Sequence, residues 1–279
     1  MVSSRPLAPG GLAAGSGDLW VIDQWGPFLV RIDAATGAFA TPKRIDLPSE
    51  EWGTGLRGLV FGHGALWLPL RSSVARIDPG SGEVSLAYLD PSGPPSYDAH
   101  PVSHLLVTDD AVWVAGRYQD HVSRIDPATG RVAGTILVSP TLHGLAGGPR
   151  LLWMLDGAEG ALVGLDARSG HIEHSLPLGG RPTAVAAAGG RVWAAAERAE
   201  HGPDPRTGRL SWLRREGSAL VSADASTGRL ISQFEVPELV LRLFPFPGGL
   251  YAPRVDGSGV THRVARLDPT DGRVLSEFP

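Results

Sequence analysis

The chain has 279 residues, with 25 Lys and Arg against 29 Asp and Glu and a formal net charge of -4. A chain of this length and balanced composition can bury a full hydrophobic core. The small acidic excess argues against a nucleic-acid-binding protein, because neutralising phosphates requires clustered Lys and Arg. The absence of cysteine excludes disulfides and cysteine-ligated zinc.

The first residues, MVSSRPLAPGGLAAGSG, contain no continuous apolar segment of the length found in signal peptides. No later segment is apolar over the length that a membrane span requires. We therefore expect a cytoplasmic protein without a membrane partner, unless a leader preceded this start.

Six copies of one unit follow one another along the chain, which is typical of a repeat architecture. The stretch from Val112 to Val132 shows the unit: a strand with Trp113, a polar connection, a strand ending at Asp126, and a turn closed by Gly130. The aromatic residues of the units are Trp20, Trp67, Trp113, Trp153, Trp193 and Tyr251. The aspartates are Asp33, Asp78, Asp126, Asp166, Asp224 and Asp268, and a glycine follows each of them by four residues.

Each unit reads as four short strands, A to D. Strand A is small and aliphatic, strand B carries the aromatic residue, strand C ends at the aspartate, and strand D follows the glycine. A four-stranded sheet cannot bury both faces alone, so such units stack around an axis. We therefore predict an all-β fold, a six-bladed β-propeller with four antiparallel strands per blade and the aromatic residues packed between blades. The predicted single domain spans 1–279, with blades at about 7–45, 55–90, 101–138, 140–178, 181–236 and 239–279.

The turn between strands C and D has the sequence Asp-Pro-x-Thr-Gly or a close variant. Proline presets the backbone, the Asp or Thr side chain accepts hydrogen bonds from nearby amides, and glycine takes the left-handed conformation at low cost. Since all six units carry this aspartate, we interpret it as structural.

Loop lengths differ among the units only in two kinds of connection. The distance from the aromatic residue to the aspartate is 31 residues in blade 5 against 11 to 17 elsewhere, which indicates an insertion at 198–217. The first two D-to-A connections are also long, around 48–56 and 91–101. Because these two kinds of connection share one face of a propeller, we expect the functional residues on that face.

Unusual side chains gather at the same predicted face. His104 and His143 stand at the start of strand A in blades 3 and 4, each in a Pro-x-x-His sequence, and an extra residue in the turn at 148–150 would make the two positions equivalent. We predict a funnel lined by Arg and His with a few carboxylates. Its candidate substrate-binding residues are Arg57, Arg71, Arg117, Tyr118, Arg242, Arg254 and Trp25, and its carboxylates include Asp156 and Glu197.

Each of these residues also has a structural interpretation. A histidine at the start of a strand is more often hydrogen-bonded within the fold than catalytic. Arginines near a propeller axis often satisfy backbone carbonyls that converge there. The insertion contains a second copy of the turn motif at 204–208, which is typical of a protruding hairpin, although a lid over the funnel is an alternative.

The six repeats, with their LWV-like strand B and RIDPxTG turns, resemble bacterial propellers that include virginiamycin B lyase and the YVTN-type repeat proteins, over nearly the whole chain. Enzymes like virginiamycin B lyase have seven blades and open a cyclic depsipeptide by elimination, with a carboxylate-held divalent metal and a histidine base. The resemblance implies His104 or His143 as the base and Glu197 or Asp156 as the acid or metal ligand.

Two classes of function remain open on the sequence. The first is a lyase, isomerase or cyclase that acts on a polar or anionic small molecule, using His104, His143 and Glu197 for acid–base chemistry. This class would need no cofactor, or a divalent metal such as Mg²⁺ at Asp156 and Glu197. The second is a non-catalytic propeller that binds a ligand or a protein. The sequence leaves open whether the chain is a monomer or an oligomer.

Overall fold

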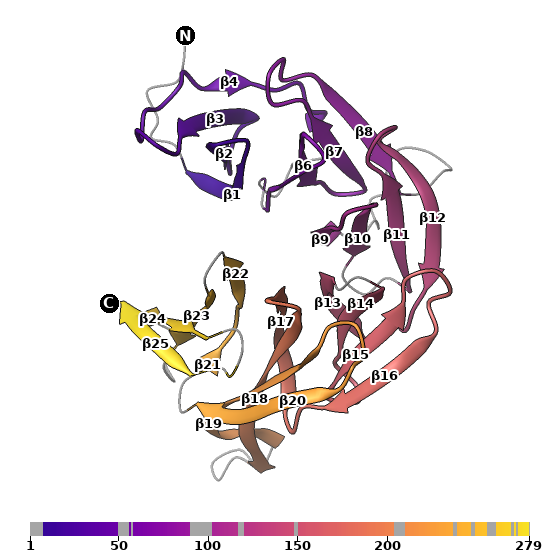
Figure 1. The fold of residues 1–279 in the computed structure, drawn as a ribbon, viewed down its shortest axis with the longest axis vertical. Helices are drawn as coiled ribbons and strands as arrows, with labels where there is room; N and C mark the ends of the chain where they lie inside the picture. Colours follow the sequence, from indigo (N-terminus) through magenta and orange to yellow (C-terminus); the bar gives the residue numbers. More distant parts are fainter. Residues whose placement is uncertain are drawn as a thin grey trace. The chain divides into compact units, whose positions relative to one another are not determined.

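The structure, a computed structural model, describes residues 8–49, 56, 58–89, 102–116, 120–147, 150–203, 210–236, 239–246, 249–255, 261–268, 271 and 273–278. These residues form six antiparallel sheets, five of four strands and one of five (Figure 1). The predicted fold class, an all-β six-bladed propeller with four antiparallel strands per blade, is confirmed. Within the described ranges, no helix is long and apolar enough to cross a membrane.

Contacts divide the chain into two compact units of three blades each, Met1–Leu137 and Val138–Pro279. The first unit contains β1 (Pro9–Gly15), β2 (Asp18–Asp23), β3 (Phe28–Asp33), β4 (Lys43–Arg44), β5 (Val60–Gly62), β6 (Ala65–Pro69), β7 (Ser73–Ile77), β8 (Val84–Tyr88), β9 (Val102–Val107), β10 (Val112–Gly116), β11 (His121–Asp126) and β12 (Arg131–Leu137). Within this unit, β5 lies against both β1 and β9, so the first strands of consecutive blades are neighbours.

The second unit contains β13 (Leu142–Gly147), β14 (Leu151–Asp156), β15 (Ala161–Asp166), β16 (Ile172–Pro177), β17 (Arg181–Ala188), β18 (Arg191–Pro203), β19 (Leu210–Asp224), β20 (Leu230–Val236), β21 (Leu239–Val240), β22 (Phe244–Phe246), β23 (Gly249–Val255), β24 (Thr261–Leu267) and β25 (Val274–Phe278). In blade 6, β21 and β22 both pair with β23 and together take the place of strand A. Within this unit, β17 lies against both β13 and β22.

The pairing of strands A and B has the same register in every blade. Each aromatic residue of strand B faces the residue seven positions before it, as Trp20 faces Ala13 and Tyr251 faces Phe244. Trp67, Trp113, Trp153 and Trp193 follow the same rule. The separation from strand B to strand C varies instead, and Trp193 faces Ser222 because β18 and β19 continue as one long hairpin to the pair Pro203 and Leu210. The predicted insertion at 198–217 therefore extends these two strands.

The repeated C-to-D turn is built as the sequence predicts. Oδ1 of Asp33 accepts hydrogen bonds from the main-chain N–H groups of Ala35 and Thr36 and from the Thr36 hydroxyl. The aspartates of blades 2 to 5 accept equivalent bonds. Gly37 has φ of 71° and donates its N–H to the Asp33 carbonyl, and the corresponding glycines of blades 2 to 5 also have positive φ. These bonds hold the pKa of the aspartates below its ordinary value.

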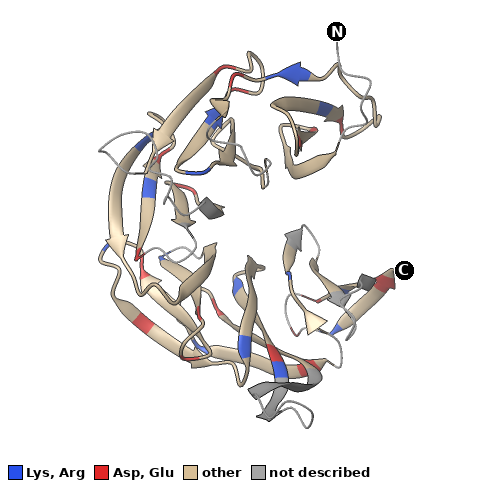
Figure 2. Ribbon diagram, turned by 180° about the vertical axis from the view of Figure 1, so that it is seen from behind, with Lys and Arg blue, Asp and Glu red and all other residues tan. Residues whose placement is uncertain are grey.

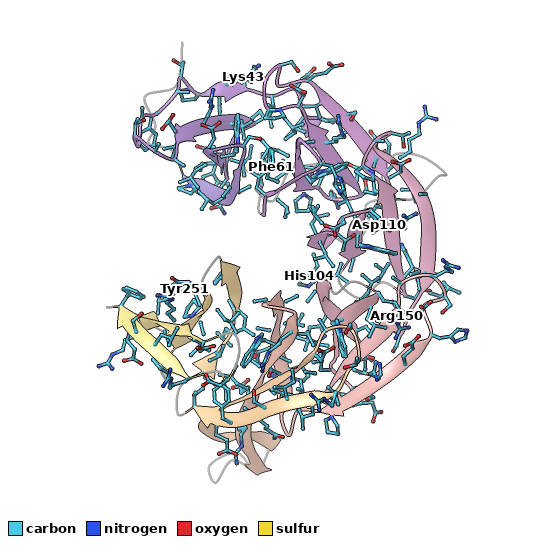
Figure 3. All side chains as sticks on the ribbon, viewed as in Figure 1. Lys43, Phe61, His104, Asp110, Arg150 and Tyr251 are labelled. Carbon is cyan, nitrogen blue, oxygen red and sulfur yellow. The ribbon has the colours of Figure 1, made fainter. Side chains whose placement is uncertain are left out.

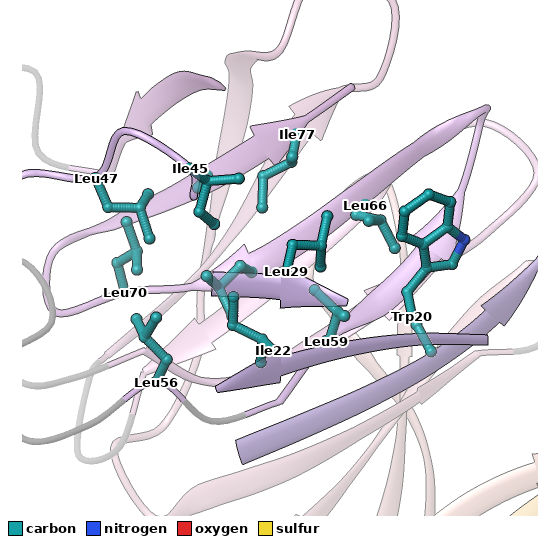
Figure 4. Close-up of a cluster of buried hydrophobic side chains, with 13 residues drawn as sticks. Trp20, Ile22, Leu29, Ile45, Leu47, Leu56, Leu59, Leu66, Leu70 and Ile77 are labelled. Carbon is teal, nitrogen blue, oxygen red and sulfur yellow. The ribbon is translucent and has the colours of Figure 1, made fainter. Parts of the chain in front are cut away.

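The hydrophobic core lies between consecutive blades, as predicted. One cluster joins blades 1 and 2 through residues such as Trp20, Leu29 and Leu66 (Figure 4). Similar clusters join blades 2 and 3, blades 4 and 5, and blades 5 and 6, with Trp67, Trp153 and Trp193 among their members. The three tryptophans are fully buried. Burial of apolar surface between blades is therefore what holds each unit together.

Blades 4 and 5 also meet through polar and aromatic contacts. Nε1 of Trp153 donates a hydrogen bond of 3.0 Å to the carbonyl of Ala225, in the turn of the next blade. The ring of His174, on β16, stacks on Trp153 with centroids 5.9 Å apart. Gly228 also lies against this ring, and an added Cβ there would come within 2.4 Å of the imidazole. The turn glycine therefore also makes room for the neighbouring blade.

Charged residues of both signs are interspersed along the strands of each unit (Figure 2). Several of them form ion pairs, such as Arg31 with Asp18 at 2.8 Å and Arg150 with Glu173 at 2.6 Å.

Candidate functional site

The start of strand A is irregular in most blades. The ladder between strands A and B is interrupted between Pro9 and Gly11, between Val102 and His104, between His143 and Ala146, and between Pro182 and Ala184. In blade 6, residues 241–243 separate the two short strands that replace strand A. Interruptions of this kind re-aim side chains and are frequent next to functional sites. In blades 3, 4 and 6 they coincide with the predicted residues His104, His143 and Arg242.

The two predicted histidines occupy equivalent positions in the ladder. His104, on β9 (Figure 3), faces Ala115, and His143 faces Leu155, and each partner lies two residues after the tryptophan of its blade. The prediction of an extra residue in the turn at 148–150 is wrong, because in both blades the tryptophan faces the strand A residue seven positions before it. The extra residue lies in the interruption after His143, where Gly144 has φ of 66°.

His143 is half-buried and is held by the residue two positions before it. Its Nδ1 lies 3.2 Å from the main-chain carbonyl of Thr141. A carbonyl can only accept, so Nδ1 carries a proton, and in the neutral imidazole Nε2 is then the nitrogen with the lone pair. The same carbonyl accepts the N–H of Gly157 at 3.1 Å. His143 is therefore set with the basic nitrogen turned away from its anchor.

Asp156, the predicted metal ligand, is the last residue of β14 and is bonded to the connection that follows this strand. Its Oδ1 accepts hydrogen bonds from the N–H groups of Ala158 at 2.9 Å and Glu159 at 3.3 Å. The same oxygen accepts the hydroxyl of Thr141 at 2.9 Å. The side chain is buried, with 9% of the residue exposed. Asp156 therefore links the B-to-C connection to the start of strand A.

Glu197, the predicted catalytic carboxylate, forms an ion pair across β17 and β18. Its Oε2 accepts Nη2 of Arg181 at 2.7 Å and Nε at 3.2 Å. Glu197 is 3% exposed, whereas the Arg181 side chain is 57% exposed. The positive charge of the guanidinium offsets the free-energy cost of burying the Glu197 carboxylate. Glu197 therefore has a structural partner in this position.

Hydrogen bonds also connect the starts of strand A in blades 5 and 6. The Thr183 hydroxyl donates to the carbonyl of Val240 at 2.7 Å, and the Val240 N–H donates to Oγ of buried Ser218 at 2.9 Å. Arg242 follows two residues later and is exposed. β17 in turn lies against β13, the strand that carries His143.

The other predicted binding residues lie elsewhere in the blades or outside the described residues. Arg71 is half-buried between β6 and β7, and Trp25 is 54% exposed, with its N–H bonded to Asp23 at 2.7 Å. Arg57, Arg117 and Tyr118 lie outside the described residues, as does the side chain of Arg254. Because the candidates come from both compact units, the common funnel stays a prediction.

Several solved structures are similar to this chain over nearly its whole length. No protein-family model and no curated protein matches the sequence. A streptogramin B lyase structure has a TM-score of 0.66 at 12% identity and covers 99% of this chain and 84% of its own. A chain of the mitotic checkpoint complex has a TM-score of 0.69 at 13% identity (98% and 79%), and the Pan2 WD40 domain of Neurospora crassa one of 0.63 at 14% (95% and 76%). The chain shares their fold. The resemblance expected from the sequence is thus confirmed at the level of the propeller, and the neighbours include both an enzyme and a WD40 domain.

A divalent metal, which the resemblance implies, does not fit the residues predicted to hold it. Asp156 is bonded to two amides and a hydroxyl, and Glu197 to a guanidinium. In the parts of the chain that the structure describes, no three His, Asp or Glu side chains gather in the way a metal ion needs.

Sequence reasoning missed Thr141 and Arg181. Thr141 lies two residues before His143, and Arg181 faces Glu197 across strands A and B. Only the register of the interrupted ladder brings these two residues to their partners. The Pro-x-x-His sequence of blade 4 contains Thr141, which was the one available signal.

Proposed function

We propose that this propeller binds a polar or anionic small molecule near the starts of strand A in its second unit, and that His143 transfers a proton on it. The reaction would be an elimination, an isomerisation or a cyclisation, in which a base removes a proton and a positive group stabilises the developing negative charge. The orientation of His143 is the observation that carries this proposal. A ring whose Nδ1 is anchored to a carbonyl presents Nε2 as a base.

Arg242 is the group that we propose for the negative charge. It is exposed, and its segment is tied to β17 by the bond between Thr183 and Val240. A guanidinium stays charged at any accessible pH and binds carboxylates with two parallel hydrogen bonds. His104 occupies the equivalent ladder position in blade 3 and remains a second candidate base. Glu197 takes no part in this proposal because Arg181 holds it.

The test measures proton abstraction and binding together. Wild-type protein is incubated in D₂O with a panel of small carboxylic acids, lactones and cyclic peptides, and NMR follows the loss of protons next to carbonyl groups. We expect exchange or conversion of at least one compound, its loss in His143→Ala, and weaker binding in Arg242→Ala. Both variants should keep their stability within about 1–2 kcal/mol, the size of ordinary polar contacts.

A non-catalytic binding propeller is the second candidate. It is favoured by the engagement of Asp156 and Glu197 in hydrogen bonds within the fold, which removes the two carboxylates predicted to work with the histidines. If His143→Ala leaves exchange or conversion unchanged, or if the panel binds with no exchange and Arg242→Ala alone weakens binding, this second function replaces the first.

A further inference from the structure

A chain of hydrogen-bonded side chains leads to the anchor of His143. The carboxylate of Asp156 can only accept, so the Thr141 hydroxyl donates to it at 2.9 Å. The Ser139 hydroxyl lies 2.8 Å from Thr141 Oγ1 and must therefore donate to Thr141. The Thr141 N–H completes the turn by approaching Ser139 Oγ at 3.4 Å. The side chains of Ser139 and Asp156 thus fix Thr141, whose carbonyl holds the imidazole.

Blade 1 shows which of these hydrogen bonds also form in a blade that lacks the threonine and the histidine. Asp23 stands at the position of Asp156 and likewise accepts an N–H two residues later, from Trp25 at 2.7 Å. The N–H of Gln24 donates to the Ala8 carbonyl at 2.6 Å, as that of Gly157 donates to Thr141. Ala8 therefore corresponds to Thr141.

The residue at the histidine position of the blade 1 ladder is Gly11, which faces Ile22, two residues after Trp20. Ala8 has no hydroxyl, and Asp23 accepts its main-chain N–H instead, at 3.2 Å. A carboxylate alone is therefore enough to form this connection. The hydroxyl of Thr141 and the imidazole of His143 are additions of blade 4 beyond that requirement.

From this difference we infer that Thr141 and Asp156 are positioning residues for His143: the carboxylate holds the threonine, and the threonine carbonyl fixes the imidazole with its proton on Nδ1. Their role deepens the proposed function, on which it rests, because a fixed Nε2 lone pair is what a base at this position requires. In this inference Asp156 orients the imidazole of His143 through Thr141.

The tautomer of His143 can be read directly and without any substrate. In ¹⁵N-histidine-labelled full-length protein, in a basic buffer where imidazole is neutral, we expect a pyrrole-type shift for Nδ1 and a pyridine-type shift for Nε2. Thr141→Val removes the hydroxyl at nearly constant shape, and Asp156→Ala removes the acceptor. In both, the two ring shifts should move toward each other as the tautomers mix.

Conservative and matched variants separate positioning from loss of structure. Thr141→Ser and Asp156→Asn retain the required groups and should restore the wild-type shifts. Asp23→Ala deletes the equivalent carboxylate of blade 1 and should leave the His143 shifts unchanged. If Asp156→Ala does not fold, Thr141→Val alone decides the question.

Wild-type shifts in a folded Thr141→Val protein would overturn the inference, as would a pyrrole-type Nε2 in the wild type. Because the ring is observed without substrate, a failure here is distinct from a failure of the proposed catalysis, which is judged by the exchange assay.

Discussion

Substituting Gly228 by alanine tests the packing of one blade's turn against its neighbour. Gly228 has φ of 68°, and an added Cβ would lie 2.4 Å from Cγ of His174. The imidazole is also stacked on Trp153, which restricts how far the ring can move. The variant should therefore suffer both backbone strain and a steric clash.

The same turn in blade 1 supplies the matched control. Gly37 has φ of 71°, and a Cβ there would meet nothing within 4 Å. Gly37→Ala should cost only the left-handed backbone, about 1–2 kcal/mol. Gly228→Ala should add about 1–3 kcal/mol of overpacking, for a total of about 2–5 kcal/mol.

Urea unfolding followed by tryptophan fluorescence measures both free energies. The double variant Gly228→Ala/His174→Ala should lose less stability than the sum of the two single variants, since removing the ring removes the clash. Equal losses in Gly37→Ala and Gly228→Ala, or strict additivity in the double variant, would refute this account of the contact between blades 4 and 5.

Three further predictions concern the hydrogen bonds described above. The turn aspartates have a lowered pKa in the folded state, so their contribution to stability is present above about pH 4 and is lost as the pH falls through their folded-state pKa. Urea unfolding at a series of pH values should therefore show an unfolding free energy that falls below about pH 4, and equal free energies at pH 5 and pH 2 would contradict this. Arg181→Met removes one guanidinium from buried Glu197 and should cost about 1–3 kcal/mol in thermal unfolding, with recovery in the double variant Arg181→Met/Glu197→Leu. Trp153→Phe deprives the Ala225 carbonyl of its donor and should cost about 1–3 kcal/mol more than Trp193→Phe, whose Nε1 has no acceptor among the described residues; equal costs would exclude a role for this bond.

The fold was predictable because its signals are local and repeated. A buried aromatic residue on strand B and an Asp-to-Gly turn recur at fixed distances, and each has one ordinary structural explanation. The seven-residue register follows from the short turn between strands A and B, which leaves little freedom in the pairing. These features depend only on residues near one another in the chain.

The site was predictable in position but not in its bonds. The interruption that places His143 opposite Leu155 depends on which backbone position leaves the ladder, and several positions near Gly144 were compatible with the sequence. The partner of Asp156 directly precedes strand A and that of Glu197 begins it, 15 and 16 residues earlier. Without the register, nothing in the sequence distinguished a free carboxylate from one bound within the fold.

The long hairpin of β18 and β19 shows where this architecture can grow. Trp193 keeps its partner Ala186 and its buried site although 29 residues separate it from Ser222, against 11 for the corresponding pair of blade 4. The added residues extend β18 and β19 beyond one end of the blade, and the packing of Trp193 between blades is unchanged. Evolution could therefore alter this connection at little risk to folding, and a designer could graft a recognition peptide at its tip while keeping the scaffold intact.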